Sequence, residues 1–201
     1  MVLRRVKVLV GCLALALGLV GWGLPGEARA VSLLVDDFST VGTPPGATTN
    51  AWNQGPIAGV LGGSREQTKS GSGTASTRAW SVGPGTVSMT TTNTATNNVW
   101  NLVYDGTSNG SLTNKINPPI DISAFTSLDL DVTQSSATPG SVLLTLVTQN
   151  PLSPASSWTS TQTINLPSGP GTVSFDLLSG MTGLFNPYSL QRIALKFQNF
   201  G

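Results

Sequence analysis

Aromatic side chains in polar segments are the residues of this sequence best suited to binding chemistry. Trp52 stands in a long polar stretch, and Trp158 stands in the run Ser156-Ser157-Trp158-Thr159. A flat indole matches the apolar face of a sugar ring, while neighbouring polar groups take its hydroxyls. We therefore expect Trp52 and Trp158, with Tyr188 as a further stacking group, to contact a glycan. The alternative is that each aromatic ring closes an end of the protein core.

Two charged residues, Arg65 and Asp105, are candidates for contacts with ligand hydroxyls. Arg65 follows Gly62-Gly63-Ser64, and such a segment can aim backbone N–H groups and a guanidinium at a sugar or carboxylate. In the alternative interpretation the glycine pair forms a tight corner, and Arg65 is buried against Asp36, Asp37 or Asp105. The structural interpretation is favoured, because a Gly-Gly corner needs no ligand to explain it.

The residue types of this sequence give little support to an enzymatic function. Asp129 and Asp131 are two apart on one predicted strand and share a face, as a paired-carboxylate glycosidase would need. Same-face carboxylates on an alternating strand are more often solvated. The chain has no His and a single Cys, and it contains no Gly-x-Ser-x-Gly motif, zinc constellation or phosphate loop. We predict that the protein is not an enzyme, with a glycoside-active enzyme as the least favoured alternative.

The first thirty residues have the organisation of a secretory signal peptide. Three basic residues lie within the first seven positions, an apolar run extends from Val8 to Leu24, and Ala28-Arg29-Ala30 follows. We predict a signal helix over residues 1–30, cleavage after Ala30, and a protein that is secreted or exposed on the cell envelope without a remaining membrane contact. A retained anchor, or lipidation at Cys12, is the alternative.

Composition limits what the remaining residues, 31–201, can form. Their number suits a single domain with its own core. Taking four basic and one acidic residue from the ten and nine of the whole chain leaves six basic and eight acidic side chains. This small negative net charge predicts no binding to nucleic acid.

The hydrophobic pattern predicts an all-β fold. Short runs rich in Val, Leu, Ile, Thr and aromatic residues alternate with Gly, Pro, Asn and Ser clusters, and Leu128, Leu130 and Val132 alternate with polar residues. A spacing of about ten residues per strand favours a jelly-roll-like two-sheet antiparallel β-sandwich. The expected strands span residues 31–38, 57–61, 77–82, 86–92, 99–104, 127–133, 141–148, 160–166, 172–177 and 190–197.

Four short pieces carry a family resemblance: Leu34 to Ser39, Val60 to Glu66, Tyr104-Asp105-Gly106, and Ile120 to Ser123. Together they resemble exported bacterial proteins of the PEP-CTERM type, whose bodies are similar to the galactose-binding jelly-roll sandwich and tend to show Trp-Asp-Gly at the third piece. The sorting tail of that group does not follow residue 201. The resemblance also implies a further strand after the last predicted one, so we expect a truncated domain or an open sheet edge there.

The resemblance also implies a metal site. Jelly-roll sandwiches of this type hold a structural Ca²⁺ with carboxylates near the start of the domain, which makes Asp36 and Asp37 candidate ligands. The alternative is that these carboxylates accept hydrogen bonds from neighbouring backbone N–H groups or pair with Arg65. No other cofactor is predicted.

The expected function is therefore the non-catalytic binding of a polysaccharide or cell-surface glycan. The alternative is a structural or adhesive surface or matrix protein without a small ligand, because one sandwich fold serves both kinds of function. A glycan binder should expose at least one loop tryptophan beside polar groups, whereas a structural protein is free to bury them all.

Overall fold

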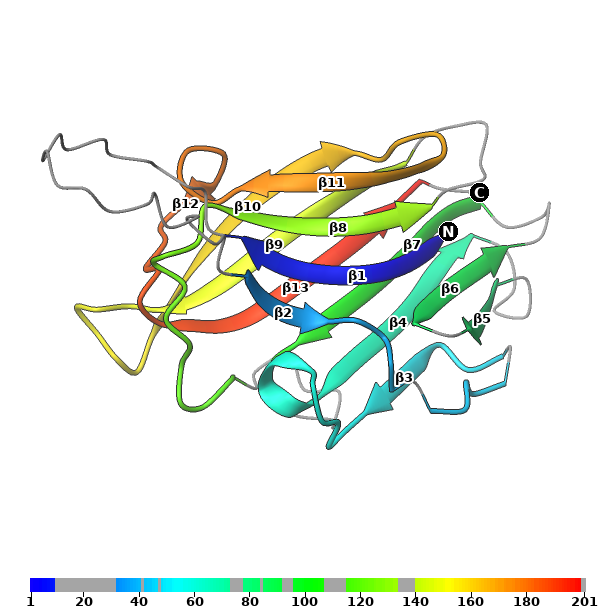
Figure 1. Ribbon diagram of the computed structural model, residues 1–201, viewed down its shortest axis with the longest axis horizontal. Helices are drawn as coiled ribbons and strands as arrows, with labels where there is room; N and C mark the ends of the chain where they lie inside the picture. Colours follow the sequence, from blue (N-terminus) through cyan, green and yellow to red (C-terminus); the bar gives the residue numbers. More distant parts are fainter. Residues whose placement is uncertain are drawn as a thin grey trace, which may run out of the picture.

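The computed structural model describes residues 1–9, 32–40, 42–46, 48–72, 78–83, 85–91, 96–106, 115–133 and 140–199. These residues form two antiparallel sheets that pack face to face (Figure 1). The described part contains one short 3₁₀ turn, η1 (Leu61–Gly63), and no α-helix. The all-β, two-sheet antiparallel sandwich predicted from the sequence is confirmed.

Six strands form the first sheet, called sheet A here. Their order is β11-β8-β1-β6-β5, and β2 pairs with β1 beside β6. The bounds are β1 (Val2–Leu9), β2 (Ser32–Asp36), β5 (Arg78–Gly83), β6 (Thr86–Thr91), β8 (Ser127–Thr133) and β11 (Pro170–Asp176).

Seven strands form sheet B, in the order β12-β10-β9-β13-β7-β4-β3. The bounds are β3 (Ala51–Gln54), β4 (Arg65–Ser72), β7 (Thr96–Tyr104), β9 (Ser141–Gln149), β10 (Ser157–Asn165), β12 (Thr182–Gly183) and β13 (Leu190–Gln198). The last strand, β13, is paired on both sides, by β9 and β7. It is therefore not an edge strand, and the open sheet edge expected there from the sequence is wrong.

Strand alternation places the core between the two sheets. Leu144 and Leu195 of sheet B and Leu130 and Phe175 of sheet A are fully buried, while their sequence neighbours face outward. The indole of Trp100 packs on Phe197, with 5.3 Å between ring centroids. This alternation explains why most of the strands were predictable.

The expected strands differ from the observed ones at several places. Residues 57–61 form no strand, because the chain turns there into η1. β1, β3, β4 and β12 were not predicted as strands. The hydrophobic pattern does not predict β4, because its inward positions are polar: Arg65, Gln67 and Lys69, all of them buried.

The predicted signal segment is described only in part. Residues 2–9 form strand β1 and not the predicted signal helix, because they pair with strands of sheet A. Residues 10–31 lie outside the described residues. Within the described ranges no helix is long and apolar enough to cross a membrane. Cleavage after Ala30 stays a prediction.

Candidate functional site

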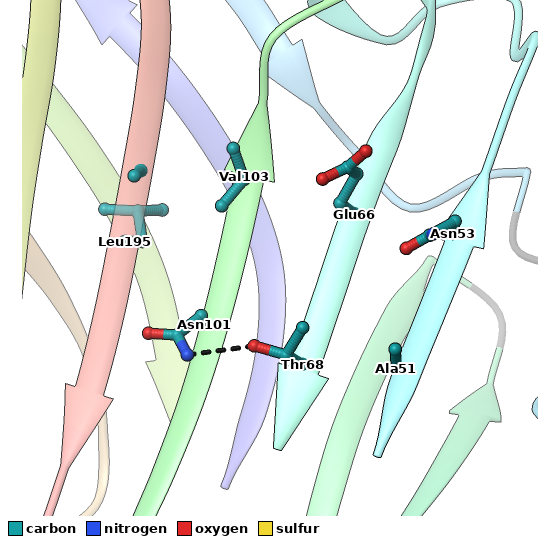
Figure 2. Close-up of a pocket in the computed structure, with 8 residues that line it drawn as sticks. Ala51, Asn53, Glu66, Thr68, Asn101, Val103 and Leu195 are labelled. Atoms are coloured by element: carbon teal, nitrogen blue, oxygen red, sulfur yellow. Dashed lines mark hydrogen bonds between the residues drawn. The ribbon is translucent and has the colours of Figure 1, made fainter. Parts of the chain in front are cut away.

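A pocket of about 400 Å³ lies on the outer face of sheet B, across strands β3, β4, β7 and β13 (Figure 2). The residues between its lining positions, Trp52, Gln67 and Leu102, point into the core and are buried. Since successive side chains of a strand point to opposite faces, the lining side chains point away from the core, except that of Leu195, which is buried in the core. The lining residues are Ala51, Asn53, Glu66, Thr68, Asn101, Val103, Ala194 and Leu195.

The strand register sets the lining residues in two rows. In one row Glu66 lies between Asn53 of β3 and Val103 of β7, and Val103 is in turn opposite Ala194 of β13. In the other row Thr68 lies between Ala51 and Asn101. The polar groups therefore stand on neighbouring hydrogen-bonded strands, where backbone pairing fixes their spacing.

The pocket combines hydrogen-bonding groups with an apolar floor. The Asn101 Nδ2 group donates a hydrogen bond to Thr68 Oγ1 at 2.9 Å (Figure 2). Glu66 is only 4% exposed although it lies on the outer face. Amide, hydroxyl and carboxylate groups thus adjoin the small apolar side chains of Ala51, Val103 and Ala194. Such a lining can donate to and accept from adjacent ligand hydroxyls while it contacts apolar C–H groups.

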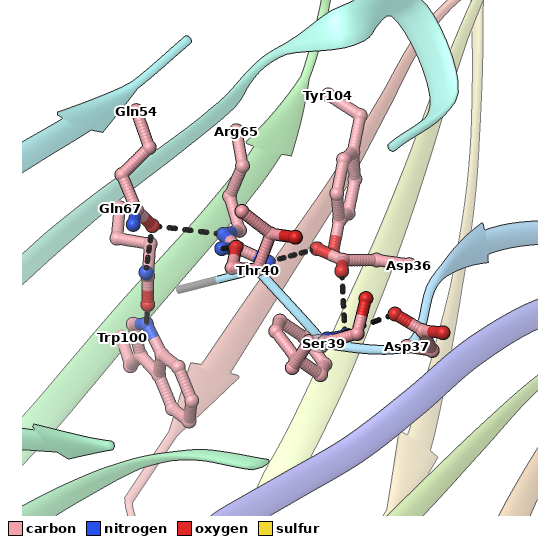
Figure 3. A network of polar contacts seen from close by, with 10 residues as sticks. Asp36, Asp37, Ser39, Thr40, Gln54, Arg65, Gln67, Trp100 and Tyr104 are labelled. Atoms are coloured by element: carbon pink, nitrogen blue, oxygen red, sulfur yellow. Dashed lines mark hydrogen bonds and ion pairs between the residues drawn. The ribbon is translucent and has the colours of Figure 1, made fainter. Parts of the chain in front are cut away.

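The residues that the sequence singled out for binding lie elsewhere, and Arg65 is the clearest case. Its guanidinium forms an ion pair with Asp36, and both side chains are buried (Figure 3). Arg65 Nη2 also donates to the Thr40 carbonyl at 2.9 Å, and the guanidinium lies 4.9 Å above the ring of Phe38. Arg65 therefore belongs to the interior, as the structural interpretation of the Gly-Gly corner predicted.

A chain of buried hydrogen bonds extends this ion pair in sheet B (Figure 3). Arg65 Nε donates to Gln54 Oε1 at 2.9 Å, and Gln67 Nε2 donates to the same oxygen at 3.1 Å. The indole N–H of Trp100 donates to Gln67 Oε1 at 3.1 Å. Each buried polar group in this chain has a partner, which removes most of the cost of its burial.

The carboxylate of Asp36 is fully engaged. Tyr104 donates its hydroxyl to Asp36 Oδ2 at 3.0 Å, and the Phe38 N–H donates to Oδ1 at 2.8 Å. Burial raises the pKa of Asp36, and Arg65 is the largest influence opposing that rise. Burial, together with the charge of Asp36, raises the pKa of Tyr104 well above 10, so its phenol remains a hydrogen-bond donor.

This engagement argues against Asp36 and Asp37 as a calcium pair. A cation at Asp36 would have to displace the guanidinium of Arg65. Asp37 instead accepts a hydrogen bond from the Ser39 N–H at 2.8 Å, and hydrogen bonds from Ser39 lower its pKa. Among the described residues no three His, Cys, Asp or Glu side chains gather where they could hold a metal ion.

The expected stacking residues do not form one platform. Trp52 is 7% exposed, because it lies on an inward position of β3 and packs against Trp80 at 5.9 Å between centroids. Trp158 is half-buried and lies on strand β10, where it pairs with Thr148 of β9, and not in a loop. Tyr188 is 68% exposed in the turn before β13.

Asp105, the remaining candidate, is also inside the protein. It is buried, with Arg192 Nη2 3.9 Å from its carboxylate. No sequence pattern singled out the pocket residues Asn53, Glu66, Thr68 and Asn101. Glu66 and Thr68 alternate with Arg65 and Gln67, which indicates that they face the opposite side of the sheet. This inference requires knowing that residues 65–72 form a strand.

Three of the four pieces of sequence that carry the family resemblance meet in space. Asp36, Arg65 and Tyr104 come from three of them and form one network (Figure 3). A Cβ on Gly62 would lie 3.1 Å from the Cα of Gly106, so the two glycine turns are in close contact. Comparisons with family models, with curated protein sequences and with solved structures gave no match for this chain.

Proposed function

We propose that this protein is an exported, non-catalytic β-sandwich that binds a sugar residue of a glycan in the pocket on the outer face of sheet B. The observation that carries the proposal is the grouping of Asn53, Glu66, Thr68 and Asn101 around an apolar floor. Export rests on the predicted signal peptide and on the resemblance to exported bacterial surface proteins.

Size and chemistry both support a small polyhydroxylated ligand. The cavity of about 400 Å³ falls within the range of about 300–1,000 Å³ usual for small-molecule sites. Two amides, a hydroxyl and a carboxylate provide the mixed donors and acceptors that adjacent sugar hydroxyls require. Among the described residues that line the pocket none is aromatic, so recognition there depends on hydrogen bonds and small apolar contacts rather than on ring stacking.

A structural or adhesive role is the second candidate, and the placement of the tryptophans favours it. Trp52, Trp80 and Trp100 are buried, whereas a stacking platform needs exposed rings. Under this alternative the Thr-rich and Asn-rich exterior is a neutral surface, and the outer-face pocket has no ligand.

The test is isothermal titration of the full chain against a panel of soluble neutral and acidic polysaccharides. Ala194→Phe places a ring in the pocket, and we expect it to abolish any saturable binding. Thr161→Phe is the matched control, because Thr161 lies on the outer face of sheet B beyond the lining residues. Asn101→Leu, which removes the amide beside Thr68, should weaken binding about tenfold, since it deletes hydrogen bonds worth roughly 1–2 kcal/mol.

Two results would contradict the proposal. One is a panel without any saturable binding by a folded sample, which would favour the structural role. The other is binding that survives Ala194→Phe but is lost in Trp158→Ala, which would move the glycan site to the end of β10.

A further inference from the structure

Strand β1 occupies an internal position in sheet A, although it comes from the segment predicted to be removed. On one side Val2–Leu9 pairs with β8 along its whole length, from Thr133 to Ser127. On the other side its first residues pair with β6 and its last residues pair with β2 (Figure 1). All three pairings are antiparallel. Both edges of β1 are thus covered by neighbouring strands.

The inward side chains of β1 are part of the core. Leu3 and Val6 have no exposed surface, and they belong to the same buried cluster as Val35 and Leu130. Without β1, these apolar neighbours and the facing edge of β8 would be open to solvent. An open strand edge beside apolar surface is a template for pairing with another strand.

The outward side chains of β1 complement the charge of their neighbours. Arg5 stands opposite Asp131 and Lys7 stands opposite Asp129 on β8. Arg5, Asp37 and Asp131 also line one shallow depression on this face. Opposite charges directly across a strand pair are stabilising, and like charges there are destabilising. The position therefore favours a strand in which basic residues alternate with apolar ones.

The link between β1 and β2 contains the predicted cleavage point after Ala30. We propose that the β1 position is a strand-acceptor slot: once this link is cut, the domain binds a strand of another polypeptide there, antiparallel to β8. Its apolar residues occupy the positions of Leu3 and Val6, and its basic residues occupy those of Arg5 and Lys7. Addition of a strand to a sheet is an established mode of protein recognition, with backbone bonds giving affinity and alternate side chains giving specificity.

The experiment uses the full chain with a site-specific protease sequence inserted between residues 20 and 21, so that the link can be cut after folding. The probe is a labelled peptide with the sequence of Met1–Leu9, followed by fluorescence anisotropy. We expect no binding to the uncut chain and saturable exchange into the cut chain. Two control peptides carry Leu3→Asp with Val6→Asp, or Arg5→Glu with Lys7→Glu.

The apolar-to-Asp peptide should not bind, and the charge-reversed peptide should bind about tenfold more weakly than the probe. If the cut chain unfolds, the peptide should prevent this when it is present during cutting. The proposal is overturned if the cut chain stays folded without taking up the peptide. It is also overturned if it unfolds despite the peptide, if the uncut chain binds equally well, or if charge reversal has no effect.

Discussion

The guanidinium of Arg65 on β4 pairs with the carboxylate of Asp36 on β2, and this ion pair joins sheet B to sheet A through the interior. Both side chains are buried. A buried ion pair contributes little net stability compared with well-packed apolar residues, but losing one partner leaves an uncompensated charge in the interior.

The first prediction concerns this pair. Arg65→Met and Asp36→Leu should each lower the free energy of unfolding by about 3–5 kcal/mol, because each leaves one buried charge without its partner. The double variant should lose less than the sum of the two. Urea denaturation followed by tryptophan fluorescence measures this, with Arg65→Lys as a milder variant that keeps the charge. Losses that simply add would show that the two side chains do not act as a pair.

The second prediction concerns alkaline pH. The pKa of Tyr104 is raised in the folded state, so its contribution to stability is complete below pH 10 and is lost as the pH rises further. In Tyr188→Phe, which leaves Tyr104 as the sole tyrosine, absorbance at 295 nm should rise only when the chain unfolds. A rise near pH 10 from a chain that still has native circular dichroism would contradict the burial of this phenol.

The third prediction concerns the turn that leads into β4. Gly62 has φ of 75°, and a Cβ there would lie 3.0 Å from Ile116 Cγ1. Gly62→Ala should therefore cost about 1–3 kcal/mol in thermal or urea unfolding. Gly63→Ala is the matched control, because Gly63 has a similar φ of 78° but no atom within 4 Å of the added Cβ. Equal losses at the two positions would mean that the contact with Ile116 is unimportant.

The fourth prediction concerns calcium. Because Arg65, Tyr104 and the Phe38 N–H engage the Asp36 carboxylate, adding millimolar CaCl₂ or EDTA should leave the melting temperature unchanged. Differential scanning fluorimetry at constant ionic strength measures this, with MgCl₂ as the control for general salt effects. A rise in melting temperature that is specific to calcium and is lost in Asp37→Asn would contradict this prediction and support a calcium site at Asp37.

Hydrophobic alternation was enough to predict most of the sandwich. β8 was placed with its observed bounds, and β9 and β13 to within one residue, because Leu and Ile residues mark their inward faces. The pattern failed at β4, where polar residues point inward. It failed also at β3, a short edge strand inside a segment that reads as loop.

The candidate site was harder to predict than the fold. Trp52 was placed in a loop, whereas the pairing of β3 with β4 turns its side chain into the core. Asn53, Glu66, Thr68 and Asn101 come from three strands, and only the register between those strands brings them together. Register depends on long-range pairing, which local sequence does not encode at β3 and β4.

The polar interior of β4 has a consequence for how this strand finds its place. Most strands are held in register by the cost of exposing an apolar face, and β4 has almost no such face. A slip by one residue would bring Glu66 inward, where Arg65 now meets Asp36, and would set two carboxylates together in the absence of a counter-charge. Charge matching thus helps to hold β4 in register, as hydrophobicity does for β8 and β13.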